Sequence, residues 1–149
     1  MKTVKWKIKR FEALSLEELY SVLQLRSEVF VVEQNCVYQD VDGKDQKAIH
    51  LIGEFEGITV AYARLFQPKD YFENASIGRV IVKPSHRHLK LGHALMREAI
   101  QAIETTFGES KITISAQLYL QKFYESHGFV VTSETYLEDD IPHIEMERD

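Results

Sequence analysis

Hydrophobic residues recur along this chain with two periods, one typical of strands and one typical of helices. Every second position is apolar at Val4, Trp6 and Ile8, which predicts a half-buried strand. Two apolar runs, AIHLIGEF and ITVAYARLF, meet at Glu56-Gly57 and predict a β-hairpin. The other strand-like runs are IGRVIV, KITISA, FVVTSE and HIEMER, the last two around a turn at 140–142.

Helical spacing appears in three other segments. Ser15 followed by Glu18 is a capping-box pattern, and it predicts the start of a helix with apolar positions at Leu19, Leu23 and Phe30. A second helix is predicted after Pro84, with Gly108 placed to end it. Its apolar stripe comprises Leu91, Leu95, Ala99, Ala102 and Ile103. A third helix is predicted from Gln117 to His127, with Gly128 as its C-terminal cap.

Together these elements predict an α/β fold with a mixed sheet, because hairpins and helical crossovers both occur. The segment from Glu33 to Lys47 is polar and is expected to be a long loop or a broken helix. With 149 residues, the chain is too short for two sizeable cores, so residues 1–149 are predicted to form a single domain.

Composition narrows the function classes. The chain is 44% hydrophobic and carries a net charge of −5, which is typical of a soluble globular protein and disfavours a nucleic-acid partner. No apolar run approaches the ~20 residues of a membrane span, and MKTVKWKIKRFEAL lacks the apolar stretch of a signal peptide. We therefore expect a cytoplasmic protein without a membrane partner. Cys36 is the only cysteine, so a disulfide scaffold is excluded. With no clear histidine partner in the sequence, Cys36 is predicted to be a small apolar filler.

Metal binding is not expected. His86, His88 and His93 fit no standard zinc spacing and have no partner cysteine. The segment from Asp40 to Asp45 resembles a calcium loop, but the glycine and the glutamate that such a loop needs are absent from the required positions.

Charge is unevenly distributed. Residues 74–97 contain no acid, whereas acids gather at Glu28, Glu33, Asp40, Asp42 and Asp45 and again at Glu138, Asp139 and Asp140. If the two acidic groups meet in space, they favour a cationic partner. The basic window is either a solvated face or a local site for a polyanion.

The basic window contains the strongest functional signal, which is a strand, then KPSHRHLKLG, then a helix. A helix N-terminus offers unpaired N–H groups to a phosphate, and Gly92 leaves room for a close approach. Arg87 and Lys90 add positive charge at the same place. Neither GxxxxGK[ST] nor GxGxxG occurs, which disfavours a nucleotide triphosphatase and a dinucleotide dehydrogenase.

The stretch from Arg87 to Gly92 resembles the Arg/Gln-x-x-Gly-x-Gly/Ala pyrophosphate loop of the GNAT superfamily of N-acetyltransferases. FYESHGF resembles the segment in which an aromatic pair and a Gly-Phe end the last helix of that family. The chain is most similar to the ElaA-like branch, through LRSEVFVVEQNCVYQDVDGKD, AQLYLQKFYESHGF and DDIPHIEM. Lys90 stands where most of the superfamily has its first glycine.

This resemblance implies a GNAT domain whose cosubstrate is acetyl-CoA. The strands VIV and KITISA would splay to admit the pantetheine arm. The residues implied to bind the cosubstrate are Val80, Ile81 and Val82 on the strand, Arg87, His88, Leu89, Lys90, Leu91, Gly92 and His93 in the loop, and Gln117 early in the last helix.

The resemblance also implies the chemistry, which is direct attack of an amine on the thioester in a ternary complex. A backbone N–H near Ile81 would stabilise the oxyanion, and Tyr124 would protonate the leaving thiolate. Glu33 and His143 are the candidates for acceptor binding or proton removal. His50 is expected to be a satisfied core histidine, and the strand residues Arg64 and Arg79 are expected to orient carboxylates.

Two functional hypotheses therefore remain open. The first is an N-acetyltransferase acting on a small-molecule or peptide-borne primary amine. The second is a non-catalytic acyl-CoA-binding sensor or interaction module that shares the cofactor loop. An uncovered sheet edge at the C-terminal hairpin would allow a homodimer.

Overall fold

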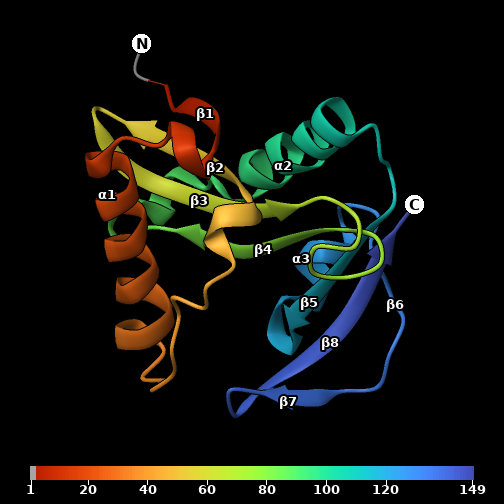
Figure 1. Ribbon diagram of the computed structural model, residues 1–149. Coiled ribbons are helices and arrows are strands. Elements are labelled where there is room, and N and C mark those ends of the chain that lie inside the picture. Colours follow the sequence, from red (N-terminus) through yellow and green to blue (C-terminus); the bar gives the residue numbers. More distant parts are fainter. Residues whose placement is uncertain (1–2) are drawn as a thin grey trace.

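The computed structural model describes residues 3–149, so the first two residues of the predicted domain lie outside the described part of the chain. Eight strands form one sheet in the order β1-β2-β3-β4-β5-β8-β6, with β7 paired to β8 (Figure 1). The strands are β1 Lys5–Arg10, β2 Ile49–Phe55, β3 Ile58–Phe66, β4 Ala75–Val82, β5 Ile112–Gln117, β6 Val130–Val131, β7 Tyr136–Glu138 and β8 Ile141–Arg148. All neighbours are antiparallel except β4 and β5, so the sheet is mixed, as predicted.

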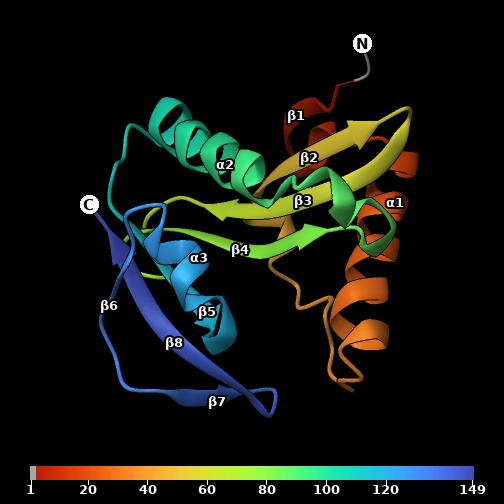
Figure 2. The same ribbon diagram turned by 180° about the vertical axis from the view of Figure 1, so that it is seen from behind.

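Helices cover both faces of the sheet. They are α1 Leu16–Arg26, α2 Gly92–Phe107 and α3 Gln121–Glu125. Successive strand residues face opposite sides, and the two cores follow this rule. Ile52 and Tyr62 pack with Val22 of α1, whereas Leu51 and Ala61 belong to the core that contains α2. The helices α1 and α2 therefore lie on opposite faces (Figures 1 and 2).

Local sequence signals place several elements correctly. The side chain of Ser15 accepts from the backbone N–H of Glu18 while the carboxylate of Glu18 accepts from the N–H of Ser15, which confirms the capping box. The β2–β3 turn has φ of 52° at Glu56 and 79° at Gly57, the geometry of a tight hairpin. Gly108 ends α2 with φ of 69°.

The first helix differs from the prediction. After Arg26 it continues as a π-helical segment, Ser27–Glu33. The residues that it buries in α1 are Val22, Leu25 and Arg26, rather than Leu19 and Leu23, which are only half-buried. Apolar spacing alone does not predict this buried face, because the face includes the charged residue Arg26.

Both ends of the sheet also differ from the prediction. Ile8 on the edge strand β1 is 46% exposed, while Trp6 packs so close to Gly53 that a Cβ there would lie 2.8 Å from its ring. The run FVVTSE contributes only the two residues of β6 to the sheet. The unpredicted strand β7 forms the tight hairpin with β8, and its turn lies at 139–140, so Pro142 is part of β8.

A buried cluster of ions fixes the segment after the π-helix. Arg26, at 0% exposure, pairs with Asp40 at 2.9 Å and with Asp45 at 2.7 Å. Arg64 contacts Asp42 and Asp45, and Arg79 contacts Asp40, as expected for arginines that orient carboxylates. We call these six residues the ion cluster. It holds residues 40–45 against β3 and β4.

The ion cluster corrects one expectation about charge. Burial opposes ionisation of the Asp42 carboxyl, but hydrogen bonds from Arg64 lower its pKa to about 2. The three aspartates are matched by three arginines, while Glu28 pairs with Lys83 and Glu33 with Arg87. The first acidic group is thus neutralised within the protein and does not present free negative charge to a partner.

The strands β4 and β5 separate soon after they meet. Only Ala75 and Ser76 of β4 pair with β5, opposite Ile112 and Thr113, and the two strands then diverge (Figure 1). The splay expected between VIV and KITISA is confirmed. Beyond the point where the strands part, two residues of β4, Arg79 and Val80, lie opposite the single residue Ala63 of β3, and Arg79 adopts φ of 50°. This is a β-bulge, which re-aims the backbone groups of β4. Within residues 3–149, no helix is long and apolar enough to cross a membrane.

Candidate active site

A cavity of about 320 Å³ occupies the space where β4 and β5 diverge. Its walls come from β4, β5, the segment before and within α3, the start of α2, the segment after the π-helix and the β7–β8 hairpin. Of the residues predicted for the site, those lining the cavity are Val80, Ile81, Val82, Arg87, Gly92, Gln117, Tyr124 and His143. The fold thus brings residues separated by up to 63 positions, from Val80 to His143, into one cavity.

One end of the cavity reaches the start of α2. No side chain caps this helix, and its first turn carries no acid, so its N–H groups and positive dipole end are available to an anion. A short 3-10 helix, Pro84–Leu89, precedes it and carries His88 and Leu89. With Lys90, Leu91 and His93, these residues surround the helix start but do not line the cavity itself.

The arginine of this loop is held by an exposed ion pair. Arg87 donates two hydrogen bonds of 2.7 Å to Glu33, and its Nε donates to the carbonyl of Val82. The hydrogen bond to Arg87 lowers the pKa of Glu33. Both side chains are more than one third exposed, and such pairs contribute about 0–1 kcal/mol. Arg87 can therefore exchange Glu33 for a phosphate at little cost.

This ion pair changes the interpretation of Glu33. The side chain was predicted on the acceptor side, but it lies beside the loop that leads into α2 and does not line the cavity. As an ionised partner of a guanidinium it is a weak base. Its arrangement indicates a role in holding Arg87 rather than in removing a proton from an amine.

Lys90 adopts the left-handed conformation, with φ of 55° and ψ of 47°. This backbone geometry favours glycine, the residue that most of the superfamily has here. Lysine therefore keeps the loop shape of glycine at the cost of some strain, and its side chain is exposed.

We expect Lys90→Gly to change the free energy of unfolding by less than about 1 kcal/mol, because relief of strain is offset by the entropy that glycine loses on folding. Lys90→Val should destabilise by about 1–2 kcal/mol more, since a β-branched residue fits this conformation poorly. Urea unfolding of both variants measures the difference. Equal stabilities would contradict a left-handed conformation at this position.

Tyr124 lies in α3, lines the cavity and is 6% exposed. Its ring packs edge-on against Phe123 and Phe129. Burial, and then the neighbouring Tyr119 phenol, raise the pKa of Tyr124 well above its usual range. The raised pKa keeps the phenol protonated at neutral pH. Because none of the described residues accepts a hydrogen bond from its hydroxyl, the hydroxyl can donate to a ligand.

Gln117 lies at the end of β5 and not at the start of the last helix, where it was predicted. Its amide exchanges hydrogen bonds of 3.3 and 3.4 Å with the amide of Gln34. Because Gln34 follows the π-helix, this pair joins the two sides of the cavity.

The opposite end of the cavity carries His143 and Glu138. His143, 6% exposed, lies on β8 directly opposite Gln117 of β5, so both side chains share the cavity face. Its Nδ1 lies 2.7 Å from the carbonyl oxygen of Ile141, and its Nε2 lies 3.3 Å from Glu138 Oε2. Glu138 also accepts a hydrogen bond from Ser115. Ser115 in turn hydrogen-bonds Tyr136, whose ring stacks on His143.

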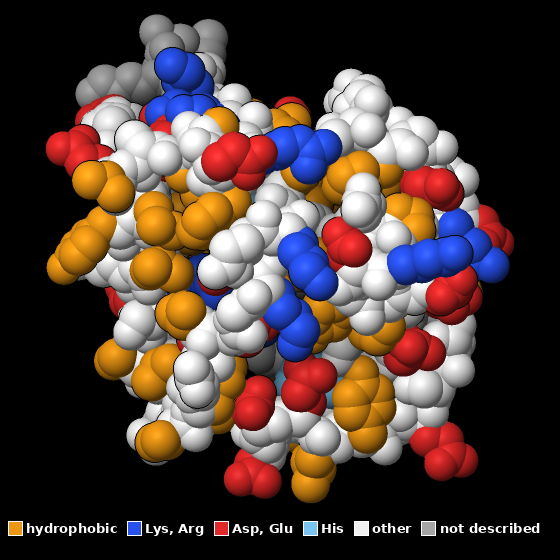
Figure 3. Space-filling view, viewed as in Figure 1, with side chains coloured by type: hydrophobic (Ala, Val, Ile, Leu, Met, Phe, Trp, Pro, Cys, Tyr) orange, Lys and Arg blue, Asp and Glu red, His pale blue; other side chains and the backbone are white. Residues whose placement is uncertain are grey.

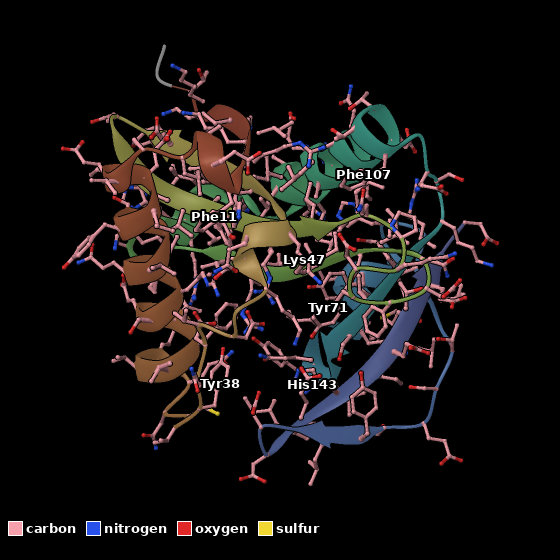
Figure 4. All side chains as sticks on the ribbon, in the orientation of Figure 1. Phe11, Tyr38, Lys47, Tyr71, Phe107 and His143 are labelled. Atoms are coloured by element: carbon pink, nitrogen blue, oxygen red, sulfur yellow. The ribbon has the colours of Figure 1, made fainter. Side chains whose placement is uncertain are left out.

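The segment after the π-helix forms the facing wall of this end. Tyr38 comes from that segment and His143 from β8, and both line the cavity (Figure 4). The phenol of Tyr38 donates to Asp40 of the ion cluster. Cys36, predicted to be a small apolar filler, is half-buried and lines the cavity, where its Sγ lies 3.3 Å from the carbonyl oxygen of Asp139.

The sequence did not predict that Glu138 lines the cavity and contacts His143, although it showed the acidic group at 138–140. The contact depends on strand register: pairing of β7 with β8 places Glu138 opposite Ile141 and so next to His143. His50, by contrast, is buried between the Tyr62 hydroxyl and the carbonyl of Asp45, as expected of a satisfied core histidine. No group of three or more metal-ligating side chains occurs in residues 3–149.

Known proteins resemble this chain along almost its whole length. A family model described as "Acetyltransferase (GNAT) domain" matches residues 12–149. Protein ElaA of Escherichia coli is 42% identical over 148 residues, covering 98% of this chain and 97% of the relative, and a UPF0039 protein of Schizosaccharomyces pombe shows the same identity and coverage.

Two solved structures agree with this similarity. One is described as an acyl-CoA N-acyltransferase from Pseudomonas aeruginosa, with a TM-score of 0.93 and 46% identity. The other is E. coli ElaA, with a TM-score of 0.91 and 41% identity. Each similarity covers 99% of this chain and all of the other.

Proposed function

This chain belongs to the acetyltransferase (GNAT) family, and on that basis we propose that it transfers an acetyl group from acetyl-CoA to a primary amine. The observation that carries the proposal is the cavity between β4 and β5, with an uncapped helix start at one end and Tyr124 in its wall. The description of the similar Pseudomonas aeruginosa protein as an acyl-CoA N-acyltransferase supports the same reaction class.

The residues present fit an acyl-CoA. Backbone groups of β4 beyond Ser76 are not paired with β5, so they are free to hydrogen-bond an extended amide-containing chain such as pantetheine. At the end of that strand, the N–H groups at the start of α2 and the guanidinium of Arg87 suit the pyrophosphate. Gly92 lines the cavity there and presents no side chain to the ligand.

The chemistry we propose is direct attack of the neutral amine on the thioester carbonyl. Ile81 follows the bulge in β4 and lines the cavity, and we propose that a backbone N–H near it stabilises the oxyanion. As the carbon–sulfur bond breaks, the Tyr124 hydroxyl donates its proton to the leaving thiolate. No covalent acyl-enzyme is needed, and we assign no nucleophilic role to Cys36.

Acetyl-CoA binding is the first test, measured by thermal unfolding of the wild type and of Gly92→Asp. Binding to the folded state alone should raise the stability of the wild type by about 2.7 kcal/mol at a hundredfold excess over Kd. In Gly92→Asp this shift should disappear, because a carboxylate at the helix start repels the pyrophosphate. A Cβ at Gly92 would meet only the Phe123 ring, at 3.4 Å, so the variant is expected to fold.

The matched control is Gly92→Asn, which has nearly the same size without the charge. It should keep a larger part of the shift than Gly92→Asp. Absence of any shift in the wild type at millimolar acetyl-CoA would refute the proposed function. Equal shifts in all three proteins would place the cosubstrate elsewhere.

A further inference from the structure

Negative charge that the protein does not neutralise gathers at the end of the cavity away from α2. The two arginines that line the cavity are already paired, Arg79 with Asp40 and Arg87 with Glu33. Glu138 and Asp139 line it as well, and no lysine or arginine of residues 3–149 forms an ion pair with either. Acidic side chains gather over this hairpin at the lower edge of the molecule (Figure 3). This end of the cavity therefore attracts a cation.

The contacts of His143 define what kind of cation fits. A carbonyl oxygen only accepts hydrogen bonds, so the 2.7 Å contact with Ile141 assigns a proton to Nδ1 of His143. In the neutral ring Nε2 then carries a lone pair, and it faces the Glu138 carboxylate at 3.3 Å. Two acceptors at this separation need a donor between or beside them. A primary ammonium, with three N–H groups, can donate to both.

We propose that Glu138 and His143 together bind the acceptor as a primary ammonium and remove its proton. This inference rests on the proposed acyl transfer and names the acceptor class for it. Glu138 supplies the countercharge, and Nε2 of His143 takes the proton, forming an imidazolium that Glu138 stabilises. His143 thus acts as the base, while Ser115 and Tyr136 hold the pair in place.

The proton balance of the reaction is complete with these groups. The ammonium gives one proton to Nε2 of His143, and the neutral nitrogen forms a bond to the thioester carbon. The carbon–sulfur bond breaks, and the thiolate takes the proton of Tyr124. The nitrogen loses its second proton as the amide forms, which restores the phenol, and the imidazolium releases its proton to water.

The same charges exclude one class of amines. An α-amino acid carries a carboxylate two bonds from its nitrogen, and this would lie close to Glu138 and Asp139. Like charges at short range in a partly buried site are strongly unfavourable. The acceptor is therefore a primary alkylamine without an adjacent carboxylate, carried on a small molecule or on a side chain.

The experiment measures thiol release from acetyl-CoA with tyramine and tyrosine as a matched pair of acceptors, and with cadaverine as a second alkylamine. Wild-type kcat/KM should be about 100-fold higher for tyramine than for tyrosine, whose only reactive amine has a carboxylate beside it. Glu138→Gln should raise KM for the amine by about 10- to 100-fold, because a charge-assisted contact is lost. His143→Gln should lower kcat by about 100-fold with a smaller change in KM.

Glu134→Gln is the matched control for Glu138→Gln, since it makes the same chemical change on an exposed residue outside the cavity. The acetyl-CoA thermal shift should be the same in all these variants. If Glu138→Gln behaves like Glu134→Gln, or if tyrosine reacts as well as tyramine, the acceptor assignment is overturned while the proposed function stands. If the wild type binds acetyl-CoA but acylates none of these amines, the assignment is also overturned. Loss of acetyl-CoA binding in the wild type would overturn the proposed function itself.

Discussion

Replacing Tyr124 with phenylalanine is expected to lower kcat for acyl transfer by about 100-fold or more and to leave the Kd for acetyl-CoA within about twofold of the wild type. A positioned general acid typically contributes about 10²–10⁴ in rate. The high pKa of Tyr124, caused by burial, keeps the phenol protonated, and its ring remains packed on Phe123 and Phe129 without the hydroxyl. The measurement is steady-state thiol release beside equilibrium binding of acetyl-CoA.

The matched control is Tyr20→Phe, on a tyrosine of α1 that is 73% exposed and lies outside the cavity. Its kcat should equal that of the wild type. Because no described residue accepts a hydrogen bond from the Tyr124 hydroxyl, Tyr124→Phe should be nearly as stable as the wild type. An unchanged kcat in Tyr124→Phe would rule out Tyr124 as the general acid. Absence of thiol release in the wild type, with acetyl-CoA binding intact, would instead favour a passive acyl-CoA-binding module.

The second large effect concerns stability. Arg26→Met is expected to lower the free energy of unfolding by about 3–5 kcal/mol, since removing one partner of a buried ion pair leaves its counterions uncompensated. Arg26 is fully buried and contacts both Asp40 and Asp45. Single domains are stable by only about 5–15 kcal/mol, so this loss is a large share. Urea unfolding of the full chain provides the measurement.

Two comparisons separate the charge effect from a general loss of packing. Arg97→Met changes an exposed arginine of α2 and should alter stability by less than about 0.5 kcal/mol. The double variant Arg26→Met with Asp45→Asn restores charge balance in the ion cluster and should recover part of the lost stability. If the double variant is less stable than the additive expectation, electrostatic imbalance is not the cause.

The parts of the fold that sequence predicts well are those governed by neighbours in the chain. The capping box at Ser15 and Glu18, the hairpin at Glu56-Gly57 and the helix end at Gly108 each depend on a few consecutive residues. The family resemblance identified the loop around Gly92 and Tyr124 as candidate site residues. Short-range patterns alone would predict only that these residues belong to helices.

The parts that sequence does not predict depend on distant partners. Arg26 looks like an exposed helix residue until Asp40 and Asp45 close around it. Glu33 looked available as a base, but Arg87, 54 positions away, pairs with it. Glu138 becomes a partner of His143 only through the register of a three-residue strand too short to show a period. Each outcome is decided by tertiary contacts.

The limited pairing between β4 and β5 has a mechanical consequence. The sheet consists of two separately hydrogen-bonded ribbons, β1–β4 and β5–β8. Within residues 3–149, strand pairing between them is limited to Ala75–Ile112 and Ser76–Thr113. Side chains of α2 belong to one core cluster with residues of both ribbons, so this helix connects the ribbons across the gap between β4 and β5, which we call the seam. A ligand lying in the seam would take the place of the missing strand contacts. We therefore expect a bound acyl-CoA to reduce relative motion of the two ribbons.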